Sequence, residues 1–332
     1  MFRRFFIVLQ LFALSGCTSS PWQKIDLAER QGNLRILEQE LLAYTRLNPT
    51  DPQGYLRLGD VCGRVENWSG MLDAFSKCEA LDPFWKKHTQ NLKELFWTRS
   101  LNDGIRAQRD GSTADARQHF RNATIILPEK PLSHRLHGEM AIAVGETTSA
   151  ETSLRECLRL DEGDYRARTF LMRILFSRGH YQEAISEGEI ILDKYEQDVD
   201  ALRVLAYGYD ALNDEAAAIE AYRALLLVSK NPADLESFAA LRFKHGNYDA
   251  AVSLCRQAIQ AGGDRLTNLR SIAQSQLMQQ DFRHLHETAY QILEIRENDR
   301  TGLQLLRLAF AGLGDENAAK STERRIHELT VK

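Results

Sequence analysis

The sequence has little proline and no stretch of low complexity. Its seven prolines and twenty glycines are scattered over 332 residues, so no flexible linker of biased composition divides the chain. The apolar run from Phe5 to Leu14 is too short for a hydrocarbon layer, which needs roughly 20 residues. This composition argues against a wholly disordered chain and against a membrane span in this run.

Motifs that carry chemistry are also missing. The sequence contains no Gly-rich phosphate loop, no zinc-protease helix motif and no serine-elbow motif. Catalysis by cysteine would need an activated thiolate with a histidine partner, and no local signature suggests one. We therefore expect no catalytic residue, no cofactor and no enzymatic activity.

An excess of positive charge is absent too. The chain carries 42 basic and 46 acidic residues, a formal charge of −4. Removing Arg3 and Arg4 with a leader leaves 40 basic residues and a charge of −6. This balance gives no support to nucleic acid as a partner.

The sequence gives only weak support for a metal site. His134 and His137 are three residues apart, with Glu139 nearby, and could share one face of a helix. His137, however, falls at a position that the repeat described below turns inward, and no third ligand is obvious. We expect no metal to bind.

The first sixteen residues have the pattern of a secretory signal. Arg3 and Arg4 precede the apolar run. The run ends in Leu14-Ser15-Gly16-Cys17, which resembles a bacterial lipobox. The resemblance implies cleavage before Cys17 and acylation of that cysteine, for example by palmitate. The alternative is an ordinary signal with an incidental cysteine.

The residue after Cys17 bears on the membrane. Thr18 stands where inner-membrane retention signals usually place Asp, so the resemblance implies an outer-membrane lipoprotein that faces the periplasm. Residues 17–24 would form the lipidated cysteine and a short tether. Four further cysteines allow either a bond between Cys62 and Cys78 or four small core residues.

A periodic series of small residues organises the rest of the chain. Counting from Ala184, alanines recur at steps of 33 or 34 residues, with Leu285 in one of the places; these alanines are Ala116, Ala150, Ala218, Ala251 and Ala319. Before Ala116 the series continues to Met71 after a gap of 45 and to Leu37 after 34. A fixed period of this length predicts stacked helix pairs.

Individual units carry a recognisable pattern. Residues 52–85 have Tyr55, Leu58-Gly59, Phe75 and Pro83 at offsets that resemble the tetratricopeptide repeat. The resemblance implies an all-α, right-handed superhelical solenoid over residues 25–332, with about nine helix pairs. We place the units near 22–49, 52–85, 97–130, 131–164, 165–198, 199–231, 232–265, 266–299 and 300–332, with a helical insert at 86–96.

The same resemblance suggests a binding surface, because the first helices of such repeats line a concave groove. The groove positions of interest are Arg135, Arg166, Arg173, Phe176, Arg203, Tyr207, Phe243 and Arg270. Arginine forks onto carboxylates, so the groove could capture a peptide with acidic groups or a free C-terminus. The alternative is a solvated helix face whose arginines pair with Glu139, Asp210 and Glu236.

The sequence thus favours a non-enzymatic scaffold that is anchored by lipid to the bacterial cell envelope. Its partners would be envelope proteins or peptides, in the assembly of a pilus, secretion, polysaccharide-export or cell-wall complex. An alternative is a regulatory or accessory subunit that acts mainly through oligomer contacts. A repeat-bearing enzyme is the third possibility, although no stretch is left over for a catalytic domain.

Overall fold

The computed structural model describes residues 21–331, and every element in that range is helical. The all-α prediction is therefore confirmed. Residues 1–20 lie outside the described range, and with them the leader, Cys17 and most of the tether. No helix within residues 21–331 is both long and apolar enough to cross a membrane.

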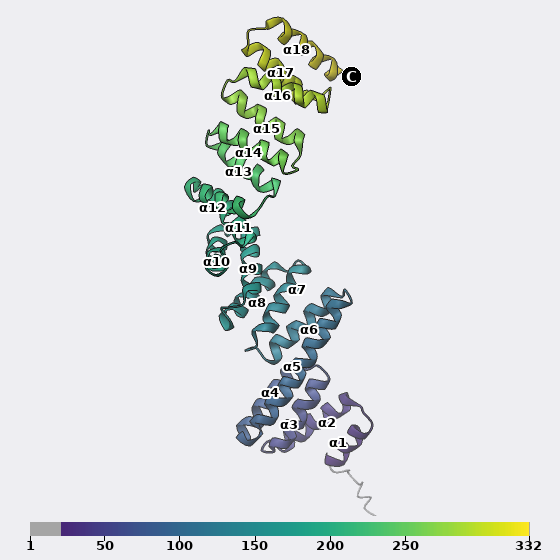
Figure 1. The fold of residues 1–332 in the computed structure, drawn as a ribbon. Coiled ribbons are helices and arrows are strands. Elements are labelled where there is room, and N and C mark those ends of the chain that lie inside the picture. Colours follow the sequence, from purple (N-terminus) through teal and green to yellow (C-terminus); the bar gives the residue numbers. More distant parts are fainter. Residues whose placement is uncertain (1–20, 332) are drawn as a thin grey trace, which may run out of the picture. The chain divides into compact units, whose positions relative to one another are not determined.

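The chain forms two compact units, residues 1–162 and 163–332 (Figure 1). The helices of the first unit are α1 (Pro21–Arg30), α2 (Leu34–Leu47), α3 (Pro52–Arg64), α4 (Trp68–Leu81), α5 (Lys86–Arg109), α6 (Thr113–Ile126), α7 (Pro131–Ala143) and α8 (Thr147–Leu160). A short 3-10 turn, η1 (Pro83–Trp85), joins α4 to α5.

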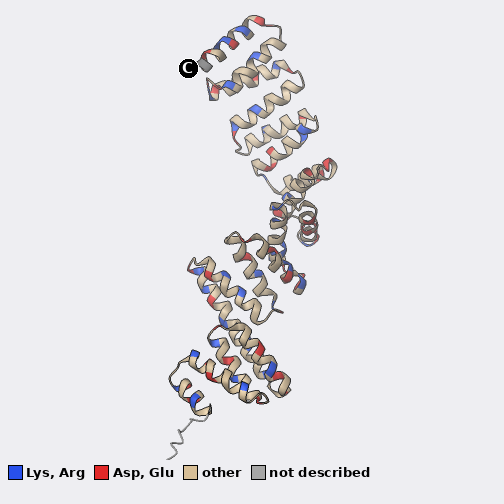
Figure 2. Ribbon diagram, turned by 180° about the vertical axis from the view of Figure 1, so that it is seen from behind, with Lys and Arg blue, Asp and Glu red and all other residues tan. Residues whose placement is uncertain are grey.

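The second compact unit continues the series of repeats, each of which consists of a first and a second helix. Its helices are α9 (Tyr165–Ser177), α10 (Tyr181–Lys194), α11 (Val199–Ala211), α12 (Glu215–Val228), α13 (Pro232–Lys244), α14 (Tyr248–Gln260), α15 (Arg265–Met278), α16 (Phe282–Ile295), α17 (Arg300–Gly312) and α18 (Glu316–Val331). Basic and acidic residues are interspersed along the helices of both units (Figure 2).

Aspartates begin the first helix of several repeats. The side chain of Asp164 accepts a hydrogen bond from the Ala167 N–H at 3.0 Å, and that of Asp198 accepts one from Ala201 at 2.8 Å. Such N-caps satisfy amides that have no partner within the helix. Each cap fixes where a helix starts.

Glycine ends several helices at the turn between the two members of a pair. Gly179 has φ +79°, and the N–H of His180 bonds back to the Leu175 carbonyl at 2.9 Å. This is the geometry of a Schellman cap, which favours glycine because other residues meet steric resistance at positive φ. Glu66, Asn213 and Gln280 nevertheless adopt the same left-handed conformation, with φ between 59° and 62°.

Small residues set the close approach of neighbouring helices, both within a repeat and between consecutive repeats. Ala184 of α10 is fully buried. A Cβ added to Gly208 of α11 would lie 2.9 Å from Cγ1 of Ile185, and one added to Gly59 would lie 2.3 Å from the Phe75 ring. A larger side chain at these positions would therefore push the helices apart or displace the neighbouring side chain.

Each unit has its own apolar core. In the first unit a core cluster extends from Ile25 to Leu127, with Phe75 and Met71 fully buried. In the second unit a cluster runs from Leu202 to Ala309 and includes the fully buried Tyr222, which stacks on Phe238 at 4.9 Å. Apolar clusters thus extend across several stacked repeats.

Residues 86–96 form the first half of α5, which at 24 residues is the longest helix described. Phe96 is buried against Trp68 and against Gly63. Trp97 donates from Nε1 to the Ser133 hydroxyl at 2.7 Å. The C-terminal half of α5 therefore packs as a repeat helix, while its first turns project beyond that pattern.

Candidate peptide-binding groove

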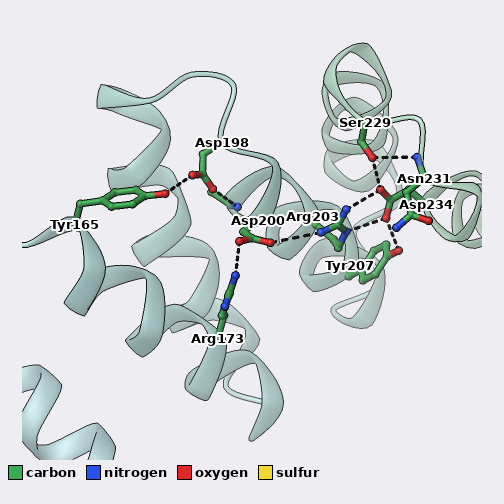
Figure 3. Close-up of polar contacts among 10 residues, drawn as sticks. Tyr165, Arg173, Asp198, Asp200, Arg203, Tyr207, Ser229, Asn231 and Asp234 are labelled. Carbon is green, nitrogen blue, oxygen red and sulfur yellow. Dashed lines mark hydrogen bonds and ion pairs between the residues drawn. The ribbon is translucent and has the colours of Figure 1, made fainter. Parts of the chain in front are cut away.

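A chain of ion pairs links the first helices of three successive repeats in the second unit. Arg173 of α9 pairs with Asp200 of α11. From the same helix, Arg203 contacts Asp200 at 3.4 Å and forks onto Asp234 of α13, with Nε–Oδ1 and Nη2–Oδ2 distances of 2.9 and 3.0 Å. Figure 3 shows these side chains meeting between the helices. The pairs fix the contact of each first helix with the next.

Asp234 is the centre of this network. It is fully buried, and it also accepts hydrogen bonds from the Tyr207 hydroxyl at 2.9 Å and the Ser229 hydroxyl at 2.7 Å (Figure 3). Burial alone would raise the pKa of the Asp234 carboxyl, but the bonds from Arg203, Ser229 and Tyr207 lower it overall. The carboxylate is charged and has a donor for each of its oxygens.

The other predicted arginines differ in their surroundings. Arg135 of α7 pairs with Glu139 one turn along the same helix, at 2.7 Å. Arg270 of α15 pairs with the buried Asp299, which caps α17. Arg166 of α9 is exposed. Four of the five predicted groove arginines are therefore paired with a carboxylate of this chain.

The ion-pairing alternative named partly different partners. Glu139 does pair with Arg135. Asp210 instead lies 3.6 Å from Lys244, and Glu236 accepts a hydrogen bond from the Asn268 amide at 2.6 Å. The carboxylates that hold Arg173, Arg203 and Arg270 are Asp200, Asp234 and Asp299.

Those three aspartates were missed by sequence reasoning, although a signal exists. They follow their arginines by 27, 31 and 29 residues, slightly less than one repeat. This separation places each aspartate in the next first helix, or at its cap, up to about two turns before the arginine's equivalent position. An Arg followed by an Asp at this spacing marks a contact between repeats.

The two predicted phenylalanines contact tyrosines of the following helix. Phe176 packs edge-on against Tyr181 at 5.3 Å, and Phe243 against Tyr248 at 5.4 Å. Phe243 also lines a hollow between α13, α14 and α15 with a volume of about 200 Å³. Tyr207, by contrast, has its hydroxyl committed to Asp234.

The hollow beside Phe243 has a buried, mainly apolar floor and a mainly polar rim. The floor consists of the buried Ala239, Ala251, Cys255, Asn268 and Ser275, and the rim of the more exposed Glu236, Ala240, Thr267, Ser271 and Gln274. Asn268 is buried and bonded to Glu236, so its amide is held in place. We call this hollow the α13–α15 pocket. Small apolar sites with a few fixed polar groups suit the capture of a side chain and its flanking backbone.

The four cysteines within residues 21–331 are buried, and the two histidines of the weak metal motif have separate hydrogen-bond partners. Cys62, Cys78, Cys157 and Cys255 are buried free thiols. Burial, with Glu38 nearby, raises the pKa of Cys62 to about 12, which opposes the reactive thiolate form. His137 bonds through Nδ1 to the Ser153 hydroxyl at 2.7 Å, while the His134 ring bonds to the Pro128 carbonyl at 2.8 Å. The two imidazoles thus have separate partners.

Comparison with known proteins bears on the fold. No family model matches the chain. The C-terminal part of a TPR repeat-containing protein from Cytophaga hutchinsonii superposes with a TM-score of 0.57 at 12% identity, over 68% of this chain and 93% of that one. The fold is that of a tetratricopeptide-repeat array. MamA from Desulfovibrio magneticus RS-1 has a TM-score of 0.48 at 16% identity, over 50% of this chain and 94% of its own.

One curated relative matches in sequence. The cellulose synthase operon protein C of Xanthomonas axonopodis pv. citri is 27% identical over 152 residues, which is 46% of this chain. The match spans only 10% of that protein's length.

Proposed function

We propose that this protein is a non-enzymatic scaffold that binds a segment of a partner protein in its groove. The observation that carries the proposal is the α13–α15 pocket, an apolar hollow with a polar rim on the first helices of consecutive repeats. Its volume of about 200 Å³ suits one or two side chains. Phe243 would pack on an apolar side chain of the ligand, and Ser271 and Gln274 could bond to its backbone.

Acidic groups on the ligand would meet a limited set of arginines. Arg203 and Arg270 are bound to the buried Asp234 and Asp299. Arg166 is exposed, and the Arg173 side chain is 53% exposed despite its pair with Asp200. We infer that a carboxylate on the partner would contact Arg166 and Arg173, while the α13–α15 pocket supplies the apolar anchor.

Photo-crosslinking in intact cells tests the groove. A photoreactive residue at Ser271 or Gln274, on the pocket rim, should give discrete adducts identifiable by mass spectrometry. The same residue at Gln257, exposed on α14, is the control. Ala240→Arg, which fills the pocket, should abolish the rim adducts. Adducts that persist in Ala240→Arg would contradict this site.

We further propose that Cys17 carries the lipid anchor and that the protein faces the periplasm from the outer membrane. The lipobox-like Leu14-Ser15-Gly16-Cys17 and Thr18 support this address. The sequence match to a cellulose synthase operon protein supports the polysaccharide-export option among the envelope complexes.

The anchor has its own test. Cells grown with a clickable palmitate analogue should label the wild-type protein, and Cys17→Ser should remove the label. A labelled Cys17→Ser variant, or an unlabelled wild type, would refute acylation at this residue and leave the groove proposal untouched.

A further inference from the structure

The turn η1 and the start of α5 present aromatic and basic side chains together. Phe84 is 69% exposed, and Lys86, Lys87 and His88 are exposed beside the partly buried Trp85. We call these five residues the aromatic-lysine patch. They lie where the repeat period is interrupted by the insert, so the packing of consecutive repeats does not account for them.

The patch is held in a defined shape. Asp82 caps the turn, with its carboxylate accepting from the Phe84 N–H at 3.0 Å. The three rings contact one another, with centroid distances of 5.4 Å for Phe84–Trp85, 5.8 Å for Phe84–His88 and 5.2 Å for Trp85–His88. The contacts with Trp85 and His88 therefore restrict the exposed Phe84 ring to one orientation.

The acids closest to the patch are already engaged. Glu79 is bonded to the Thr89 hydroxyl at 2.5 Å and paired with Lys93 at 3.1 Å, and Asp82 is the cap of the turn. A hollow of about 600 Å³ lies beside them, lined by Phe84, Lys86, Lys87, Gln90, Asn91 and Lys93 among others. The local surface is thus basic on a chain that is acidic overall.

We propose that the aromatic-lysine patch binds anionic phospholipid headgroups at a membrane surface. Aromatic rings favour the boundary between headgroups and acyl chains, and lysines near an anionic surface are attracted to it. Phe84 and Trp85 would enter the boundary layer, while Lys86 and Lys87 would contact phosphates. The lysine-lined hollow is large enough to receive one headgroup. This contact does not depend on acylation of Cys17.

Vesicle binding tests the proposal on the chain from Thr18 onward, which keeps every described helix and lacks any acyl group or leader. It should sediment with phosphatidylcholine vesicles that contain phosphatidylglycerol and not with phosphatidylcholine alone. Lys86→Glu/Lys87→Glu should lower the partition coefficient by roughly tenfold or more, because each lysine contributes about fivefold. Phe84→Ala should also weaken binding.

The control variant reverses two charges at the far end of the same helix. Arg106 and Arg109 are exposed near the end of α5, and Arg106→Glu/Arg109→Glu should retain binding. Lipids brominated in the upper acyl chain should quench tryptophan fluorescence in the wild type and not in Trp85→Phe. Equal binding to neutral and anionic vesicles would overturn the proposal, and so would an equal loss of binding in both charge variants. Binding of an acidic protein by a chain that does not bind vesicles would also overturn it.

Discussion

Arg203 and Asp234 form an ion pair in which the carboxylate is almost completely buried. The Asp234 side chain is 1% exposed and that of Arg203 is 29% exposed. A buried carboxylate that loses its cation keeps its desolvation cost without compensation. The network therefore makes each of the two residues strongly dependent on the other.

We expect Arg203→Ala to destabilise the second unit by about 2–3 kcal/mol, somewhat below the range for fully buried pairs because Arg203 is partly solvated. Urea unfolding would measure this loss. Arg223→Ala is the matched control, since its pair with Glu220 is solvent-exposed and should contribute less than about 0.5 kcal/mol. Equal losses in the two variants would refute the special role of Asp234.

His137 makes the first unit sensitive to acid. Burial, and then the nearby Arg117 and Arg121, lower the pKa of its imidazole to about 4, below an unfolded value of about 6.5. The stability that depends on neutral His137 is therefore fully present above about pH 6.5. It is lost as the pH falls towards 4.

When the pH falls from about 7.5 to 5, protonation linked to His137 should lower the free energy of local unfolding of α7 and α8 by about 2 kcal/mol. Hydrogen exchange of their amides would detect the change. His137→Gln should remove most of this pH dependence, whereas His134→Gln, on the same helix, should keep it. An unchanged profile in His137→Gln would show that another group titrates.

At the scale of a helix, the left-handed turn residues are a point of strain. Gln280 has φ +59° where Gly179 has φ +79°, and a side chain in this region costs roughly 1 kcal/mol or more. Gln280→Gly should therefore raise stability by up to about 1 kcal/mol, and Gly179→Ala should lower it by a similar amount. Thermal unfolding would report both. Gln279, at φ −81°, is the control, because Gln279→Gly should not stabilise.

The contact between paired helices depends on small side chains. Ala184 is fully buried, so Ala184→Leu should overpack it and cost about 1–3 kcal/mol. Ala216→Leu, at an exposed position of α12, should change stability by less than about 0.5 kcal/mol. Thermal unfolding of the two variants distinguishes a real packing position from a coincidence of spacing.

At the scale of the whole molecule, the second unit has an apolar core cluster of its own. The core cluster from Leu202 to Ala309 lies entirely within residues 163–332. We expect a fragment of residues 163–332 to fold alone, with the same helical content per residue as the full chain by circular dichroism and with cooperative thermal unfolding. A fragment without cooperative unfolding would mean that the first unit is needed for folding.

The sequence was sufficient to predict the class of fold, because a period of 33 or 34 residues is repeated many times. Which positions of the first helices face a groove stays a prediction. The sequence did not single out the acid that pairs with each arginine, because the Arg-to-Asp separation varies between 27 and 31 residues and therefore does not follow a strict period. The α13–α15 pocket depends on the small side chains of Ala239, Ala240 and Ala251 coming together, which only the packed helices reveal.

The pairs Arg173–Asp200, Arg203–Asp234 and Arg270–Asp299 each join neighbouring repeats. A duplication or deletion cut at a repeat boundary would therefore separate an arginine from its aspartate unless the copied unit supplied an equivalent acid. If such a protein is lengthened by copying repeats, the new contact between repeats must be complementary in charge as well as in shape. This constraint would limit which repeats can be exchanged during evolution or in protein engineering.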